Sequence, residues 1–236
     1  MNKKNAEVAQ LVEHQPSKLR VASSNLVFRS KRSQIETSIF FNMIKMKKII
    51  LASNSPRRKE LLGGLDIPFE VKNINGLDES FSDDLKGEEI PLFLSEKKSD
   101  AYSEFWSKPD SIVITADTIV WMNNKVLGKP KDREEALEML RSMSGKSHYV
   151  YTGVCVRSAE KKISFVCSSE VRFANLEESE IEYYVDKYQP YDKAGSYGVQ
   201  EWIGYIGVEH INGSFYNIMG LPIQRLYTVM KKEFLF

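Results

Sequence analysis

The chain of 236 residues lacks the features typical of secreted, membrane and zinc proteins. Its two cysteines, Cys155 and Cys167, lie in strand-like runs without metal-ligand spacing, so we interpret them as reduced core residues of a cytosolic protein. No apolar run is long enough to cross a bilayer, and no stretch resembles a secretory signal. The formal net charge is only +1, which gives no global field to attract nucleic acid or a membrane surface.

Several catalytic motifs are missing as well. Residues 145–147 read Gly-Lys-Ser like the end of a P-loop, but Leu140 occupies the position of its first glycine. There is no nucleophile elbow, no histidine pair with zinc spacing and no dinucleotide-binding glycine pattern, and we expect His148 and His210 in strands. Because no nucleophile is evident, metal-assisted attack by water is the natural chemistry.

Residues 1–45 also lack helical or strand periodicity, and they are basic and rich in Ser, Asn and Gln. A disordered tail and a targeting peptide are two interpretations of such a segment. A third is a transfer RNA gene translated by mistake, because residues 8–14 can be encoded as a D-arm and residues 23–26 as a T-arm. On this hypothesis Met46 is the true start, residues 1–45 are spurious or disordered, and residues 46–236 form one domain.

From Met46 onward the chain alternates between apolar and amphipathic segments, and 42% of all its residues are hydrophobic and 28% charged. This alternation predicts an α/β fold with at least one antiparallel hairpin. The expected strands cover residues 47–52, 69–73, 111–121, 125–127, 147–157, 162–174 and 203–211. The expected helices cover residues 56–63, 88–105, 132–143, 177–187 and 221–232.

The segment from Ile49 to Arg58 is the strongest local signal for a binding site. A buried strand runs into Ser53-Asn54-Ser55, and Pro56 then opens a helix with Arg57 and Arg58 in its first turn. Free N–H groups at a helix start attract anions, and arginine matches phosphate geometry. The alternative is a surface turn with two solvated arginines.

Further candidate residues lie on other elements. Asp117 follows an apolar strand, so its carboxylate needs a cation, a metal or several donors, unless it only holds a turn. Lys97 shares a helical face with Phe93 and Leu94, although it could be an ordinary helix lysine. Basic residues also stand in Gly128-Lys129-Pro130 and at Lys193. The acidic loop with Asp78 and Glu79 could join Asp117 around a hard cation, or could simply be solvated, and Gln200 could contact a base edge.

Together these motifs resemble the Maf family of nucleoside triphosphate pyrophosphatases, once described as septum-formation inhibitors. The resemblance spans residues 46–236 in the right order. The matching segments are Ser53 to Arg58, Ala116-Asp117-Thr118, Gly128-Lys129-Pro130, Ser144-Gly145, His148, Thr152-Gly153-Val154, Asp192 to Gln200, Ile211 to Ser214 and Gly220-Leu221-Pro222.

The resemblance implies one elongated α/β domain, with a mixed sheet and two lobes around a deep nucleotide cleft. It implies that Asp117 is the proton acceptor that activates water, and that Glu79 and Asp117 hold a divalent metal, with Mg²⁺ expected and Mn²⁺ or Co²⁺ as alternatives. The residues implied to bind the triphosphate are Ser53, Arg57, Arg58, Lys97 and Lys129.

Three positions separate the branches of the family, and here they hold Arg57, Thr118 and Gln200. This set resembles the branch that acts on dTTP and UTP, so the resemblance implies hydrolysis of those nucleotides to the monophosphate and pyrophosphate. From the cysteines and the net charge we expect a cytoplasmic enzyme with no nucleic-acid or membrane partner, and a homodimer is left open. Two alternatives are a pyrophosphatase for 7-methyl-GTP or another modified nucleotide, and a nucleotide-binding regulator of cell division without required catalysis.

Overall fold

The structure is a computed structural model that describes residues 47–234. The interpretations of residues 1–45, including the transfer RNA hypothesis and the start at Met46, lie outside the described residues. Within residues 47–234, no helix has the length and apolar character needed to span a membrane.

A single mixed sheet of seven strands organises the described part of the chain. Strand β1 pairs in parallel with β2 and β3, and the other pairs are antiparallel, in the order β2-β1-β3-β5-β6-β7 with β4 on β3. The α/β class and the mixed sheet expected from the sequence are confirmed. The strands are β1 (Lys48–Leu51), β2 (Glu70–Val71), β3 (Ser111–Met122), β4 (Lys125–Leu127), β5 (Ser147–Arg157), β6 (Lys162–Phe173) and β7 (Val208–Asn212).

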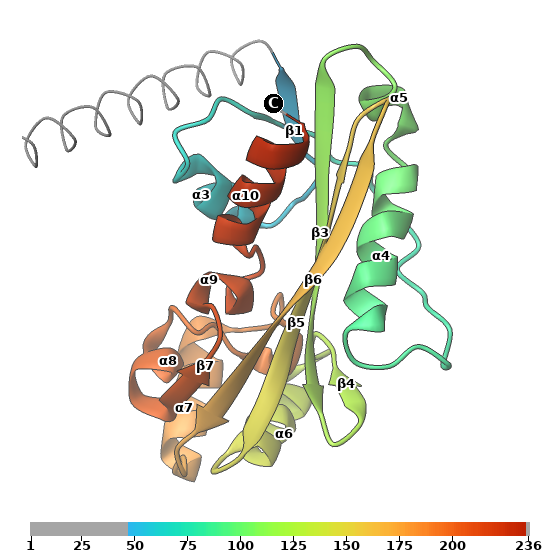
Figure 1. Cartoon of the computed structure of the whole chain (residues 1–236). Coiled ribbons are helices and arrows are strands. Elements are labelled where there is room, and N and C mark those ends of the chain that lie inside the picture. The colour runs from blue at the N-terminus through green and yellow to red at the C-terminus, as the bar shows by residue number, and fades with distance from the viewer. Residues whose placement is uncertain (1–46, 235–236) are drawn as a thin grey trace, which may run out of the picture. The chain divides into compact units, whose positions relative to one another are not determined.

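Helices cover both faces of this sheet (Figure 1). Helix α4 lies on one face against β3 and β5, whereas α3 and α10 lie on the opposite face. The helices are α3 (Pro56–Gly63), α4 (Glu89–Asp100), α5 (Ser103–Trp106), α6 (Arg133–Met143), α7 (Glu178–Tyr188), α8 (Trp202–Gly207), α9 (Phe215–Ile218) and α10 (Ile223–Glu233), with a 3₁₀ turn η1 (Ala194–Ser196).

Helix α4 is seated unusually close to the sheet, and Gly153 makes this possible. A β-carbon at Gly153 would lie 2.1 Å from the carbonyl oxygen of Pro91 in the first turn of α4. The buried Thr115 hydroxyl also donates to the carbonyl oxygen of Ser95 at 2.7 Å, which joins the middle of α4 to β3. These two contacts fix which α4 side chains can reach the sheet.

The expected strand over residues 203–211 is wrong in its first half, because Trp202–Gly207 forms helix α8 and only Val208–Asn212 is a strand. A β-carbon at Gly204 would lie 1.9 Å from the carbonyl oxygen of Val199, so the glycine lets the helix fold back on the preceding turn. In the helix, Ile203 and Gly207 are buried while Tyr205 is 82% exposed. The buried positions are four residues apart, as in a helix, but the two glycines, Gly204 and Gly207, hide this spacing in the sequence.

The expected helix over residues 88–105 is divided into α4 and α5 at Tyr102. The Tyr102 hydroxyl accepts a hydrogen bond from the backbone N–H of Ile74 at 3.0 Å and donates to the carbonyl oxygen of Lys72 at 3.2 Å. Packing of this buried ring therefore sets the break. The strand positions expected for His148 and His210 are confirmed, and both cysteines are free thiols, of which Cys155 is buried and Cys167 half-buried.

Candidate active site

The candidate site opens where one edge of β3 has no strand partner among the described residues. Strand β1 pairs with β3 over residues 111–114, and β4 pairs with the same edge over residues 120–122. The opposite edge is covered by β5 over residues 113–121. The gap at residues 115–119 borders a cavity of about 630 Å³, at the carboxyl end of β1 where α/β proteins place ligands.

Nearly all the candidate residues from the sequence line this cavity. Those that do are Ser53, Arg57, Arg58, Glu79, Asp117, Thr118, Lys129, Lys193 and Gln200, joined by Lys98 and Asp192. They come from segments that are far apart in the chain: the β1–α3 turn, the acidic loop before α4, the middle of β3, the end of β4 and the segment around η1. The sheet topology therefore brings together motifs that are separated in the sequence.

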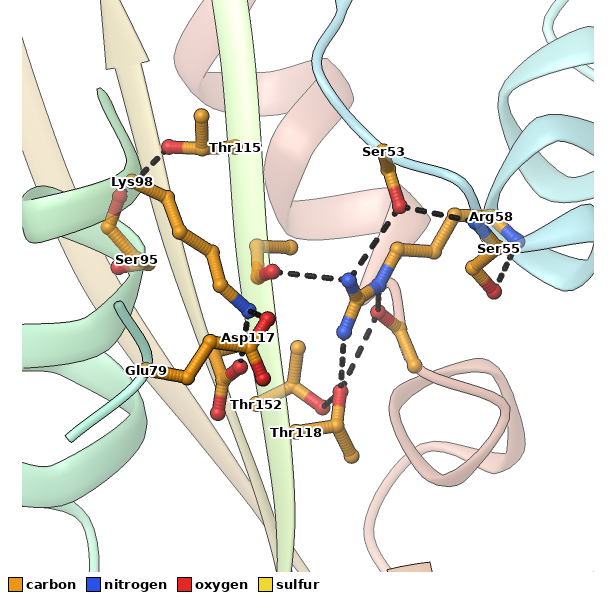
Figure 2. A network of polar contacts seen from close by, with 12 residues as sticks. Ser53, Ser55, Arg58, Glu79, Ser95, Lys98, Thr115, Asp117, Thr118 and Thr152 are labelled. Atoms are coloured by element: carbon orange, nitrogen blue, oxygen red, sulfur yellow. Dashed lines mark hydrogen bonds and ion pairs between the residues drawn. The ribbon is translucent and has the colours of Figure 1, made fainter. Parts of the chain in front are cut away.

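Arg58 anchors the cavity wall with most of its hydrogen-bonding capacity (Figure 2). Its guanidinium donates to the carbonyl oxygens of Gly220 and Ala116, both at 2.8 Å, and to Thr118 Oγ1 at 3.0 Å. A longer contact of 3.4 Å reaches Ser53 Oγ. Burial lowers the pKa of Arg58, and the charge of Asp117 partly offsets this effect. Because one of about five N–H bonds is left for a ligand, Arg58 mainly holds three segments in place.

Thr118 completes this anchor on the face of β3 that Arg58 contacts. Its hydroxyl is 3.0 Å from the hydroxyl of Thr152 on the neighbouring strand β5. The helix that presents Arg58 starts with Pro56 at its first turn, and the Ser55 side chain caps it by accepting from the Arg58 backbone N–H at 3.4 Å. The helix start expected from the sequence is therefore confirmed, and it faces the cavity.

Lys98 joins the two acidic candidates at the other side of β3. Its ammonium lies 2.6 Å from Asp117 Oδ1 and 3.0 Å from Glu79 Oε1, and Figure 2 shows it reaching from α4 to both carboxylates. Burial opposes ionisation of Glu79, but Lys98, Lys129 and Arg58 outweigh it and hold the pKa of Glu79 below its ordinary value. Both carboxylates are thus arranged for a cation.

Lys97 does not reach the cavity. Its ammonium pairs with Asp78 Oδ2 at 2.8 Å and with the carbonyl oxygen of Ser80 at 2.8 Å, and none of these three residues lines the cavity. Phe93, one turn before Lys97, is 41% exposed, whereas Leu94, one turn before Lys98, is 4% exposed. Residues three and four apart share a helix face. Both residues one turn before Lys98, Leu94 and Ser95, are buried, and this separates Lys98 from Lys97.

Arg57 and Lys129 also line the cavity, and they make fewer hydrogen bonds to the other described residues than Arg58 does. Arg57 Nη1 pairs with Asp192 Oδ2 at 2.9 Å, a contact between α3 and the segment before η1. Lys129 follows β4, and the carbonyl oxygen of its neighbour Gly128 accepts a hydrogen bond from the Gly195 N–H at 3.0 Å. Both cations therefore sit on segments that are tied to the region around η1.

Gln200 lies on a turn that the buried Tyr197, three residues earlier, helps to hold in place. Its amide oxygen Oε1 is buried and has no hydrogen-bond partner among the described residues. The preceding Tyr197 is buried, its hydroxyl lies 2.8 Å from His148 Nε2, and both rings pack edge-to-face with Phe173. A buried acceptor without a partner is costly unless a ligand supplies the donor.

His148 makes stability depend on pH. Burial lowers the pKa of His148 from 6.5 to about 4. Between pH 6.5 and pH 4, His148 is therefore protonated in the unfolded chain but neutral in the folded protein. We expect the free energy of unfolding to fall on the order of 2–3 kcal/mol between pH 7 and pH 4.5 from this group. Urea unfolding at both pH values measures it. His148→Gln should lose this part of the dependence and His210→Gln, at an exposed site, should keep it; equal slopes in all three proteins would contradict the assignment.

The residues present fit a divalent cation held with help from a ligand. No group of three or more His, Cys, Asp or Glu side chains in residues 47–234 is placed to hold a metal by itself. Glu79 and Asp117, however, already converge on one cationic group within a roomy cavity. Mg²⁺ is commonly bound by one or two carboxylates together with water and substrate phosphates, and this pair of oxygen ligands suits it.

Comparison with known proteins places these motifs in a family. The family model described as Maf-like protein matches residues 48–233. A protein of Bacteroides thetaiotaomicron named dTTP/UTP pyrophosphatase is 62% identical over 185 residues, which cover 78% of this chain and 95% of that protein. Proteins with the same name from Parabacteroides distasonis and Porphyromonas gingivalis are 56% and 52% identical, covering 80% of this chain and 97% and 95% of their own lengths.

Proposed function

This chain belongs to the Maf-like protein family, and from that membership we propose that it hydrolyses dTTP and UTP to the nucleoside monophosphate and pyrophosphate. The observation that carries the proposal is the convergence of Asp117 with Arg57, Lys98 and Lys129 in one cavity. A triphosphate brings several negative charges, and such a set of cations can neutralise them. The names of the relatives support the same activity.

In the proposed reaction, the Asp117 carboxylate accepts a proton from the water that attacks the α-phosphorus. The bond from the α-phosphorus to the α–β bridging oxygen breaks, and that oxygen leaves with the pyrophosphate. Arg57, Lys98 and Lys129 stabilise the charge that develops on the leaving pyrophosphate. Ser53 lies beside this set at the helix start, and Arg58 positions the wall around it. A divalent cation, which Glu79 and Asp117 would hold, would neutralise phosphate oxygens when bound.

Base selection is proposed to depend on Gln200, with Arg57 and Thr118 beside it. Thymine and uracil carry an N3–H donor next to carbonyl oxygens, while cytosine lacks that donor. The unpartnered Gln200 amide oxygen can accept this N3–H, and its amide nitrogen can donate to a base carbonyl. Phosphate contacts alone cannot make that distinction.

We also propose a cellular compartment and a substrate form for this reaction. The free thiols of Cys155 and Cys167 are compatible with a reducing compartment, and we place the enzyme in the cytoplasm, acting on a free nucleotide rather than on nucleic acid.

A nucleotide panel with pyrophosphate detection tests the function. The full chain is incubated with Mg²⁺ and with dTTP, UTP, dCTP, GTP or 7-methyl-GTP. We expect dTTP and UTP to be hydrolysed with the highest kcat/KM and to release pyrophosphate rather than phosphate. Preference for 7-methyl-GTP would identify a different substrate class, and nucleotide binding without hydrolysis would favour a regulatory protein.

Gln200→Glu should reduce the preference for dTTP over dCTP about 100-fold in kcat/KM. The carboxylate loses the donor to the base carbonyl, but it can accept from the cytosine amino group. The readout is the ratio of the two kcat/KM values. Gln224→Glu makes the same chemical change on α10, where the amide donates to the Thr228 hydroxyl and does not line the cavity, and should leave the ratio unchanged. An unaltered ratio in Gln200→Glu would remove Gln200 from base selection.

A further inference from the structure

A continuous chain of ion pairs connects Arg57 to the residue after Gln200. Arg57 Nη1 lies 2.9 Å from Asp192 Oδ2, and the other oxygen of that carboxylate lies 2.8 Å from Lys193 Nζ. Lys193 Nζ in turn lies 3.1 Å from Glu201 Oε1. Two of the three positions proposed to select the base, Arg57 and Gln200, are thus linked across the cavity through Lys193.

Glu201 transmits this linkage to the turn that carries Gln200. Its second carboxylate oxygen accepts a short hydrogen bond from the Tyr184 hydroxyl, and that hydroxyl accepts from the backbone N–H of Gly198 at 3.0 Å. The Glu201 N–H donates to the carbonyl oxygen of Gly198 at 2.9 Å. A β-carbon at Gly198 would lie 2.8 Å from Glu201 Cδ, so the carboxylate packs directly against the turn.

Lys193 is the least exposed charged member of this chain of ion pairs. Its side chain is 9% exposed, compared with 21% for Glu201 and 59% for Asp192. Burying an ammonium is costly unless it is paired, and both of its carboxylate partners are needed to compensate. The ammonium is therefore held in one place between them, and it holds Glu201 in turn.

We propose that Lys193 is a positioning residue for base selection, which fixes Glu201 and the Gln200 turn and couples them through Asp192 to Arg57. The inference rests on the function proposed above. Lys193 does not need to touch the base in this role. Its loss would let the Gln200 amide move relative to the base edge, which lowers selectivity rather than chemistry.

The test is Lys193→Met in the full chain, assayed with dTTP and with dCTP. We expect the ratio of kcat/KM for dTTP to that for dCTP to fall about tenfold. The change should come from a higher KM for dTTP, with kcat altered much less. A purely structural role would lower kcat/KM for both nucleotides equally, and that outcome would overturn the proposal.

A second variant keeps the test decisive if Lys193→Met unfolds because the half-buried Glu201 carboxylate loses its ion-pair partner. Lys193→Met combined with Glu201→Gln removes both charges, and we expect it to fold and show the same tenfold loss. Lys162→Met is the matched control, because Lys162 also pairs with a glutamate, Glu96 at 2.9 Å, away from the cavity. A wild-type ratio in either folded Lys193 variant would overturn the proposal, whereas a wild-type protein inactive on dTTP and UTP would refute the function itself.

Discussion

Asp117→Asn is expected to lower kcat for dTTP at least about 10³-fold, because the amide cannot take a proton from the attacking water. The change keeps the size of the side chain, so the contact with Lys98 can persist through the amide oxygen. One negative charge is removed from a cavity that receives a polyanion. Binding of dTTP, measured by calorimetry, should therefore be as tight as in the wild type or tighter.

Asp78→Asn provides the matched control for this experiment. Asp78 is also paired with a lysine of α4, Lys97, but it does not line the cavity. The hydrogen bond from Lys97 holds the pKa of Asp78 well below its ordinary value. We expect Asp78→Asn to keep kcat within about threefold of the wild type. Turnover by Asp117→Asn at a similar level would exclude Asp117 as the proton acceptor.

The sequence predicts the parts of this site that depend on local order along the chain. The strand, turn and helix from Ile49 to Gly63 result from an apolar run, a capping serine and a proline at the first helical turn, and the structure confirms them. The position of Asp117 within a buried strand is confirmed in the same way. Each of these features is decided by neighbouring residues.

Features that depend on contacts between distant segments were not predictable in this way. The hydrogen bonds of Arg58 to Gly220 and Ala116 use carbonyl oxygens that no side-chain pattern reveals. Helix α8 was missed for a different, local reason: its apolar residues also fit a strand, and the close approach of Gly204 to the backbone of Val199 is not visible in the residue pattern. The resemblance of motifs identifies which residues belong to the cavity, but only the sheet topology shows that residues 115–119 form its edge.

The two neighbouring lysines of α4 show how one residue of register decides a site. Successive helical residues are rotated by about 100°, so Lys97 and Lys98 cannot face the same surroundings. The sequence favoured Lys97 because it shares a face with Phe93 and Leu94, but of these two residues only Leu94 is buried. Leu94 marks the buried face, and the close approach of α4 at Gly153 turns Lys98 toward Asp117.

Lys98→Met is accordingly expected to lower kcat/KM for dTTP by about 10²–10³-fold, while Lys97→Met changes it less than about threefold. Without the Lys98 ammonium, Glu79 and Asp117 face each other uncompensated and a cation is lost from the triphosphate site. The two variants share the same chemical change on the same helix, so differences in helix propensity cancel. Melting temperatures measured alongside separate loss of fold from loss of activity. If folded Lys97→Met lowered kcat/KM for dTTP more than Lys98→Met did, Lys97 rather than Lys98 would be the lysine that contacts the triphosphate.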